Sequence, residues 1–368
     1  MRTALLAVGT RPEAIKMFSV ARALTARGVR VQTLAVLQQR ELLLATFDAL
    51  GWQPDEQIER IGAGFSLSAM MTGVTTALAT AIEARKPDVV VVQGDTTTAF
   101  AGALAGFYAK VAVAHVEAGL RTWDLAMPFP EEAHRALIDQ IATLCLAPTP
   151  LAADNLRRAG VPEARITITG NTVIDALRTV RAELPPRERF TREGRRTIVV
   201  TCHRRENFGQ GVLEVCAAVK TLAARHSDLS FVVTSHPNPN VSRHIEAELT
   251  GHPAVQVVAP LPYREFVHLL ADAWLILTDS GGIQEEATSL GRPFFILREG
   301  TERPEAVGAG LVVGATASAI TQSFQTLSDE PAVYARMATP SDVFGDGRAG
   351  ERCAEAIVKH LDAAPRPV

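Results

Sequence analysis

A doubly wound α/β fold in two consecutive halves is the architecture that the sequence predicts. Short apolar runs alternate with helix-forming segments along the chain, which is the pattern of βαβ units in a parallel sheet. Residues 88–95 form an almost continuous β-branched run, as expected of a central strand that is buried on both faces. The alternation stops at the polar, proline- and arginine-rich segment 184–196 and then starts again. We therefore expect two doubly wound domains with a cleft between them, residues 1–183 and 184–349, followed by a C-terminal helix at about 350–368.

The first half begins with a strand at 4–8, a turn at Gly9 and Thr10, and a helix with Pro12 in its first turn, where proline is tolerated. Residues 51–65 carry no regular pattern and are expected to be irregular. The other strands of this half are expected at 30–37, 88–95, 111–116, 144–147 and 165–169, and its helices at 39–50, 66–84, 99–108 and 131–142.

The second half repeats the same alternation, with helices between most of its strands and a last helix near 350–361. Parallel strands bring their carboxyl ends to one edge of a sheet, and α/β proteins bind ligands there. Polar side chains at those ends are therefore the candidates for function. The strands are expected at 197–202, 231–235, 255–258, 275–278, 294–297 and 311–313.

Composition excludes several classes of function. The 368-residue chain is 47% hydrophobic and carries a formal net charge of −3, which is typical of a globular protein and unlike a nucleic-acid binder. No apolar run approaches the ~18 residues of a membrane span, and no signal-peptide pattern opens the chain. The four cysteines are scattered and indicate reduced thiols rather than a metal site or disulfide frame. We expect a cytoplasmic protein with no nucleic-acid or membrane partner.

The segment 278–291, TDSGGIQEEATSLG, follows an apolar run and predicts a strand, a tight turn and a helix start. Gly281 and Gly282 allow a ligand to approach the backbone closely, and the first amides of the helix can bind a phosphate together with Ser280. Glu286 could accept hydrogen bonds from a ribose diol. The alternative is a plain βα turn whose acidic residues complement the helix dipole.

Other strand ends supply carboxylates and cations. Asp95 and Glu117 follow buried strands, where carboxylates are uncommon unless they are paired or functional, although a capping role is the alternative. Glu131 and Arg135 share one helix face, so they form either a surface ion pair or part of a site. Such carboxylates beside cations that could hold a diphosphate suggest acid/base chemistry on a nucleotide-linked substrate. The cations and further candidates are Arg11, Lys16, His203, Arg204 and His236.

Phe266 could stack on a base, although a core position at helical spacing is the alternative. The sequence contains no HExxH, no GxxxxGK[ST] and no GxGxxG after a strand. Metal, ATP-hydrolysing and nicotinamide chemistries are therefore unsupported.

Eight motifs taken together resemble one family, the non-hydrolysing bacterial UDP-N-acetylglucosamine 2-epimerases. The resemblance extends from about residue 9 to residue 314, most of the chain, and is specific because the motifs occur in one order. They are GTRPEAIKM from Gly9, QGDTTT from Gln93, HVEAGLRT from His115, FPEEAHR from Phe129, GNTVIDAL from Gly170, HRRENFG from His203, DSGGIQEEA from Asp279 and TERPEAV from Thr301.

The resemblance implies a glycosyltransferase-B-like fold with two Rossmann-like domains facing a cleft, a homodimer, and a final helix that crosses back to the N-terminal domain. It also implies interconversion of UDP-GlcNAc and UDP-ManNAc without an added cofactor or metal. The route would be anti elimination of UDP to 2-acetamidoglucal, followed by re-addition of UDP.

The resemblance also implies roles for individual residues. Asp95, Glu117 and Glu131 would be the acid/base carboxylates, and Arg135 would orient the sugar or a carboxylate. His203 and Arg11, helped by Lys16, would stabilise the leaving diphosphate. The remaining contacts would be Ser280, Gly281 and Gly282 to the phosphates, Glu286 to the ribose and Phe266 to the uracil.

One departure lies next to these residues, because His134 stands where the family usually has asparagine. Many bacterial members also carry a second UDP-GlcNAc site that activates the enzyme, and Gln38, Glu132, Arg204 and His236 match parts of it. The alternatives to this function are a hydrolysing epimerase that releases ManNAc and UDP, a UDP-sugar-dependent glycosyltransferase, and a sensor that binds without turnover.

Overall fold

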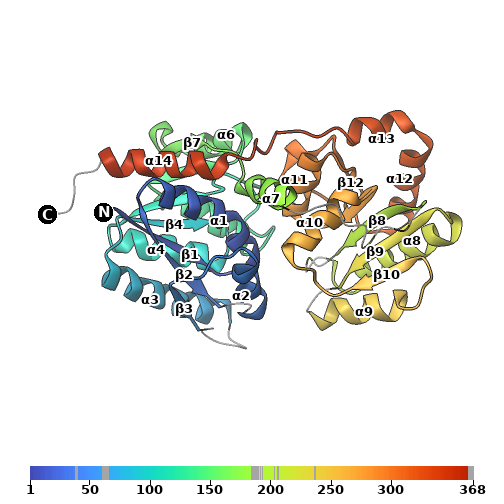
Figure 1. Ribbon diagram of the computed structural model, residues 1–368, viewed down its shortest axis with the longest axis horizontal. Coiled ribbons are helices and arrows are strands. Elements are labelled where there is room, and N and C mark those ends of the chain that lie inside the picture. The colour runs from blue at the N-terminus through green and yellow to red at the C-terminus, as the bar shows by residue number, and fades with distance from the viewer. Residues whose placement is uncertain are drawn as a thin grey trace. The chain divides into compact units, whose positions relative to one another are not determined.

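The computed structural model describes residues 1–37, 40–59, 66–183, 190, 192, 194–202, 204, 207–235 and 238–363. The chain forms two compact units (Figure 1). Unit 1 comprises Met1–Arg178 together with Phe344–Val368, and unit 2 comprises Thr179–Val343. Each unit is built on one parallel sheet flanked by helices, so the expected doubly wound α/β fold class is confirmed.

The sheet of unit 1 has seven strands in the order β3-β2-β1-β4-β5-β6-β7. The order reverses between β1 and β4, which pair side by side, as Leu5 opposite Val90 shows. A doubly wound sheet opens its ligand crevice at such a reversal. The strands are β1 Thr3–Val8, β2 Arg30–Val36, β3 Glu56–Ile58, β4 Val89–Gln93, β5 Ala112–Val116, β6 Leu144–Ala147 and β7 Ile166–Ile168.

Alternate residues of these strands enter two separate cores, because successive side chains of a strand point to opposite faces. Leu5 and Ala7 face α3, α4, α5 and α6, whereas Leu6 and Val8 face α1, α2 and α14. The helices of unit 1 are α1 Arg11–Ala26, α2 Arg40–Ala49, α3 Leu67–Arg85, α4 Thr97–Tyr108, α5 Glu131–Ile141, α6 Pro150–Arg158 and α14 Ala349–Ala363, with the 3₁₀ turn η1 Glu163–Arg165. Helix α7, Thr172–Glu183, begins in unit 1 and ends in unit 2.

The expectation that residues 51–65 are irregular was wrong at β3. Glu56–Ile58 adds an edge strand to β2, with Leu34 opposite Glu56 and Val36 opposite Ile58. The Asp55 carboxylate accepts a hydrogen bond from Thr33 N at 2.7 Å and fixes the start of the pairing. A three-residue edge strand with one buried side chain is too short to show a period of two, so its sequence gave no signal.

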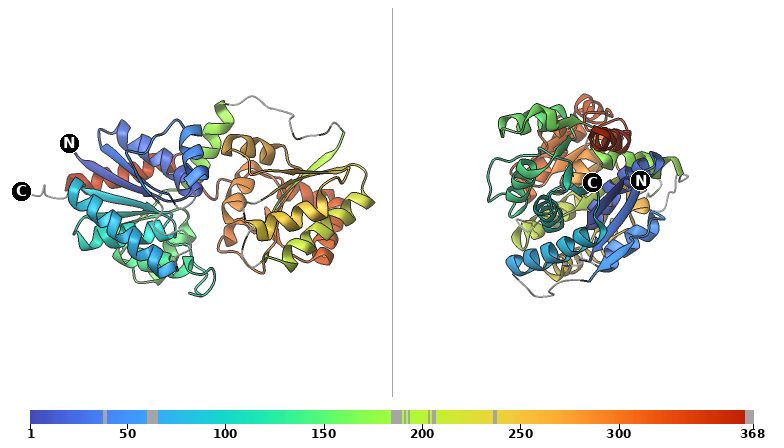
Figure 2. Two further views of the ribbon diagram at one scale, coloured as in Figure 1. Left: turned by 90° about the horizontal axis from the view of Figure 1, so that it is seen from below. Right: turned by 90° about the vertical axis from the view of Figure 1, so that its left-hand side faces the viewer.

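Helix α14, red in Figures 1 and 2, lies beside α1 although the two are far apart in the sequence. Cys353, Ala354, Ile357 and Leu361 of α14 belong to the same core as the α1 side chains. Small residues permit the close approach, since a Cβ on Gly350 would lie 2.7 Å from the carbonyl carbon of Ser19.

Among the described residues, α3 alone has the length and apolar composition of a membrane span. One side of α3 is buried within unit 1, where Val74, Leu78, Ala81 and Ile82 pack in the core next to α4. The helix is capped at its start by the Ser66 hydroxyl.

The sheet of unit 2 has six strands in the order β10-β9-β8-β11-β12-β13, and its order reverses between β8 and β11. Helices α8, α9, α12 and α13 share a core with one face, while α10 and α11 contact β8 and β11. The strands are β8 Arg196–Thr201, β9 Leu229–Thr234, β10 Val255–Val258, β11 Leu275–Thr278, β12 Phe294–Ile296 and β13 Gly310–Val312. The helices are α8 Gln210–Arg225, α9 Pro239–Leu249, α10 Tyr263–Asp272, α11 Gly281–Leu290, α12 Ala317–Asp329 and α13 Pro331–Met337, with the 3₁₀ turn η3 Pro304–Ala306.

Candidate active site

Glu117 follows β5 and is held by polar side chains from three other segments. Lys16 Nζ lies 2.7 Å from Oε1 and 2.6 Å from Oε2 of this carboxylate, and both side chains are buried. Gln93, the last residue of β4, also donates to Oε2, and Asn171 Nδ2 approaches Oε1 at 3.4 Å. The Glu117 backbone has a φ of +65°, which is uncommon for a residue with a side chain and marks a constrained site. Lys16 therefore supplies the counter-charge that a buried carboxylate needs.

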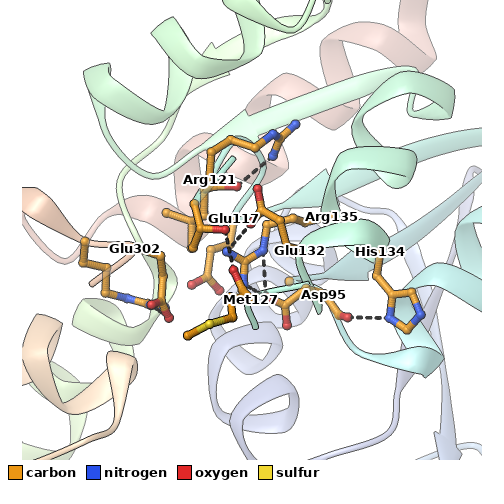
Figure 3. Close-up of polar contacts among 12 residues, drawn as sticks. Asp95, Glu117, Arg121, Met127, Glu132, His134, Arg135 and Glu302 are labelled. Atoms are coloured by element: carbon orange, nitrogen blue, oxygen red, sulfur yellow. Dashed lines mark hydrogen bonds and ion pairs between the residues drawn. The ribbon is translucent and has the colours of Figure 1, made fainter. Parts of the chain in front are cut away.

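Asp95 lies in the turn after β4 and is bound by α5 (Figure 3). Arg135 donates to Asp95 Oδ2 from Nε at 3.1 Å and also from Nη2. The same guanidinium donates to Glu132 Oε2 at 3.2 Å, and Glu132 Oε1 accepts from the Trp123 amide. Two donors on one planar group fix the carboxylate direction better than a single ammonium could.

A buried cluster of charged and polar side chains contacts the turns that contain Asp95 and Glu117. Asp139 of α5 binds His115 Nδ1 at 2.6 Å, Arg121 Nη2 at 2.6 Å and the Gly119 amide at 3.2 Å. Burial alone would raise the pKa of Asp139, but the charges and hydrogen bonds of His115 and Arg121 outweigh it and lower that pKa. The cluster thus joins α5 to the loop that follows Glu117.

The other expected residues of unit 1 lie at the starts of helices. Arg11 is the first residue of α1 and Glu131 is the first residue of α5, and both side chains are half-buried. Glu131 thus begins the helix that carries Arg135, one turn before it.

Glu13 is a buried carboxyl group of unit 1 that the sequence reasoning did not single out. Its Oε2 accepts from the Gly9 amide at 3.1 Å and the Thr10 hydroxyl at 2.7 Å, and its Oε1 accepts from the Thr96 hydroxyl at 2.7 Å. Burial raises the pKa of Glu13 to about 7, against the lowering effect of these hydrogen bonds. The side chain joins the β1–α1 turn to the residue that follows Asp95.

In unit 2, the turn after β11 has the geometry of an anion site. Ser280 is the N-cap of α11, and its amide donates to the Thr278 hydroxyl at 3.0 Å. Gly281 and Gly282 begin the helix, whose first amides have no intrahelical acceptor and can bind a phosphate. One turn on, Glu286 is buried and accepts from the Tyr263 hydroxyl at 2.8 Å. Phe266 lies half-buried in the first turn of α10.

Buried ion pairs support the turn that precedes α11. Arg303 donates to both Glu285 and Glu302, and Arg298 donates to Glu302 at 2.7 Å. Arg204 belongs to the same network, because its Nη2 lies 3.8 Å from Glu302. Its backbone amide also donates to the Asp279 carboxylate at 2.8 Å.

Comparison with known proteins agrees with this geometry. The model of the UDP-N-acetylglucosamine 2-epimerase family matches residues 22–358. The chain belongs to this family. The enzyme class expected from the sequence, a non-hydrolysing UDP-N-acetylglucosamine 2-epimerase, is thereby confirmed.

Relatives match over the full length. The UDP-N-acetylglucosamine 2-epimerase of Yersinia pestis is 42% identical over 97% of this chain and 98% of its own, and that of Escherichia coli K12 is 41% identical over 96% and 97%. Among solved structures, the Neisseria meningitidis UDP-GlcNAc 2-epimerase bound to UDP-GlcNAc is 38% identical with a TM-score of 0.94, covering 98% of this chain and 100% of that one. The Methanocaldococcus jannaschii UDP-GlcNAc 2-epimerase in complex with UDP-GlcNAc and UDP is 31% identical with a TM-score of 0.84, covering 99% and 100%.

A more distant likeness identifies the fold. The glycotransferase of kitacinnamycin has a TM-score of 0.65 at 16% identity and covers 98% of each chain. This confirms the expected glycosyltransferase-B-like fold of the epimerase.

The expected site residues of the epimerase thus occur in two groups. In unit 1 the structure brings Asp95 to Arg135 and Glu117 to Lys16, and in unit 2 it places Ser280, Gly281 and Gly282 at the start of α11. His203, Gln38 and His236 lie outside the described residues. The buried groups that sequence reasoning missed are Glu13, Asp139, Glu285, Glu302 and Arg303.

Proposed function

We propose that the enzyme interconverts UDP-GlcNAc and UDP-ManNAc by anti elimination and re-addition of UDP, without an added cofactor. The C1–O bond to UDP breaks, the C2 proton leaves, and 2-acetamidoglucal forms with a C1–C2 double bond. UDP then adds back to C1 while a proton reaches C2 from the opposite face. Because the C2 hydrogen is not acidic, departure of UDP has to lead and positive charge develops on the sugar ring.

The observation that carries this proposal is the pair of carboxylates at the ends of neighbouring strands. Gln93 at the end of β4 lies opposite Val116 of β5, so Asp95 and Glu117 follow adjacent strands. Each carboxylate faces a fixed cation, Arg135 for Asp95 and Lys16 for Glu117. Negative groups held in place before the reaction can stabilise a cationic ring without reorganising.

Inversion at C2 needs proton transfer on both faces, which requires more than one acid/base group. In our proposal Asp95, Glu117 and Glu131 provide these groups, with Arg135 orienting Asp95 or the sugar. The contacts of Lys16 support a role in pairing with the Glu117 carboxylate and fixing its direction, beside the help to the diphosphate inferred from the family resemblance. Arg11 and His203 would stabilise the leaving diphosphate.

The uridine diphosphate part is assigned to residues of unit 2. Ser280, Gly281 and Gly282 would bind its phosphates through the N-terminus of α11. Glu286 would bind the ribose through the carboxylate oxygens, one of which already accepts from Tyr263. Phe266 would stack on the uracil.

Proton NMR of the purified enzyme with UDP-GlcNAc in D2O, without metal or acceptor, tests the route. We expect UDP-ManNAc with deuterium at C2. Release of free ManNAc and UDP would assign the chain to the hydrolysing class, and binding without product would indicate a transferase or a sensor. Asp95→Asn, Glu117→Gln and Glu131→Gln then assign the carboxylates, because each should lower kcat far more than it raises KM.

We also propose that the enzyme is a cytoplasmic homodimer. An exposed apolar surface on α3, α4 and α5 supports the dimer. Only 22% of the apolar stretch of α3 is buried, and Phe107, Tyr108 and Leu137 are at least half exposed. Light scattering coupled to size exclusion would give the mass of a single chain if this proposal is wrong.

Activation by UDP-GlcNAc at a second site, through Gln38, Glu132, Arg204 and His236, is a further proposal from the family resemblance. In the described residues, Glu132 and Arg204 are engaged by Arg135 and Glu302 respectively. Hyperbolic kinetics with UDP-ManNAc in the absence of UDP-GlcNAc would contradict it.

A further inference from the structure

Two consecutive backbone carbonyls in the turn after β4 each face a histidine ring. His115 Nε2 lies 2.7 Å from Gly94 O, and His134 Nδ1 lies 2.9 Å from Asp95 O. A carbonyl oxygen only accepts, so His115 Nε2 and His134 Nδ1 are the donors in these two hydrogen bonds. The histidines come from different elements, His115 from β5 and His134 from α5.

The His134 ring is itself held in a fixed orientation. It stacks on the ring of Phe100 in α4, with centroids 5.1 Å apart and an interplanar angle of 28°. Its neighbour in sequence, Arg135, binds the side chain of the same aspartate (Figure 3). One turn of α5 therefore binds both the backbone and the carboxylate of Asp95.

This segment of backbone needs such support. Gly94 has a φ of +68°, a conformation that glycine adopts readily. Glycine adopts other conformations as readily, so the residue alone does not hold the backbone in this one. Rotation about the backbone φ and ψ bonds of Asp95 would turn its Cα–Cβ bond relative to the two carbonyls and so redirect the carboxylate, and Arg135 is a long side chain that could follow it. The hydrogen bonds to the two carbonyls oppose that rotation, and on the His115 side the bond is backed by buried Asp139.

We propose that His134 is a positioning residue for Asp95, acting through the Asp95 carbonyl rather than through the substrate. The inference rests on the catalytic role proposed above for Asp95. Misplacing a reacting group by about 1 Å can cost on the order of a hundred-fold in rate, so loss of one of several anchors should have a smaller but measurable effect.

Steady-state epimerisation by four variants tests the proposal. We expect His134→Ala to lower kcat about ten-fold, equivalent to about 1.4 kcal/mol of transition-state stabilisation, with KM changed less than about two-fold. His134→Asn should recover most of the loss, because its amide can donate to the same carbonyl. Phe100→Leu should lower kcat less than His134→Ala, since it removes the stacking and keeps the donor. Gln140→Ala, on the exposed side of the same helix, is the matched control and should leave kcat unchanged.

Asp95→Asn separates this inference from the proposed function. If Asp95→Asn keeps the parent kcat, the role assigned to Asp95 is wrong, whatever His134 does. If Asp95→Asn is inactive while His134→Ala keeps the parent kcat, Asp95 remains catalytic and the positioning role of His134 is overturned. Equal losses in His134→Asn and His134→Ala, or a loss expressed mainly in KM, would also overturn it. Thermal unfolding of each variant establishes that the compared proteins are folded.

Discussion

Lys16 Nζ lies within 2.7 Å of both carboxylate oxygens of Glu117, and each of the two residues is only 6% exposed. The pair joins α1 to the end of β5, 101 residues apart in the chain. A buried ion pair of this kind contributes little net stability when intact, but truncation of one partner is strongly destabilising.

Lys16→Met should therefore destabilise the enzyme by about 3 kcal/mol or more and abolish most of its activity. The methionine fills the space without a charge and removes the ammonium group that contacts both oxygens of the buried Glu117 carboxylate. Urea denaturation and the NMR assay measure the two effects. Arg157→Met is the control, because Arg157 pairs with Asp154 and Glu163 at the surface, where solvent screens the ion pairs, and its loss should change the stability far less than Lys16→Met does. Equal denaturation midpoints for the two variants would contradict the buried-pair argument.

Glu13 should make stability depend on pH between about 4.5 and 7. The pKa of this carboxyl rises from 4.5 to about 7 on folding, so the folded state binds a proton more tightly than the unfolded state does. The resulting stabilisation is fully present below pH 4.5 and is lost as the pH rises through 7, and it amounts to about 2–3 kcal/mol between pH 5 and pH 8.

Glu13→Gln isolates this effect, since glutamine resembles the protonated acid and does not titrate. We expect the parent to lose about 2–3 kcal/mol relative to the variant between pH 5 and pH 8, as measured by urea denaturation at both values. A difference between the two proteins that stays constant with pH would show that Glu13 is ionised in the folded state.

Most of the architecture could be predicted because its signals are local. Apolar runs such as 89–92 identify central strands, and Gly-containing turns locate the strand ends where Asp95 and Glu117 lie. Asp139 gave no such signal, because an aspartate in a helix usually faces water. Only the fold shows that its side chain is fully buried against His115 and Arg121.

The partners of the site residues could not be predicted for the same reason. Sequence spacing pairs Arg135 with Glu131 on one helix face, whereas the structure shows it bonded to Asp95 and Glu132. His134 could be recognised as a departure from the family, but its contact with the Asp95 carbonyl depends on how α5 packs against the turn after β4.

Asp175 should stabilise the start of α14 by capping its first amides. Its carboxylate accepts hydrogen bonds from the Ala349 amide at 3.0 Å and the Gly350 amide at 2.7 Å, which are the first amides of that helix. Asp175→Ala should cost about 1–2 kcal/mol, comparable to the loss of an N-cap. Hydrogen exchange should then become faster across 349–363. Glu355→Ala, an exposed position of the same helix, should leave the exchange unchanged, and equal protection in both variants would contradict the capping role.

The two glycines that begin α11 should respond differently to substitution by alanine. A Cβ on Gly281 would lie 2.2 Å from Arg303 Nη1, whereas a Cβ on Gly282 would meet no described atom within 4 Å. Arg303 is unable to move cheaply, because it is buried and paired with both Glu285 and Glu302. Gly281→Ala should therefore break a buried pair and lower stability by about 3 kcal/mol, while Gly282→Ala should change it by no more than about 1 kcal/mol.

Calorimetric titration with UDP completes the comparison of these two variants. Displacing Arg303 also disturbs Glu285 in the first turns of α11, so Gly281→Ala should weaken UDP binding more than about ten-fold. Gly282→Ala is expected to keep the parent fold. Any loss of UDP affinity in this variant would therefore come from contact between the added methyl group and a phosphate of the ligand. If Gly281→Ala matched the parent in both stability and UDP affinity, the ion pairs of Arg303 would not be needed to position the N-terminus of α11 for UDP.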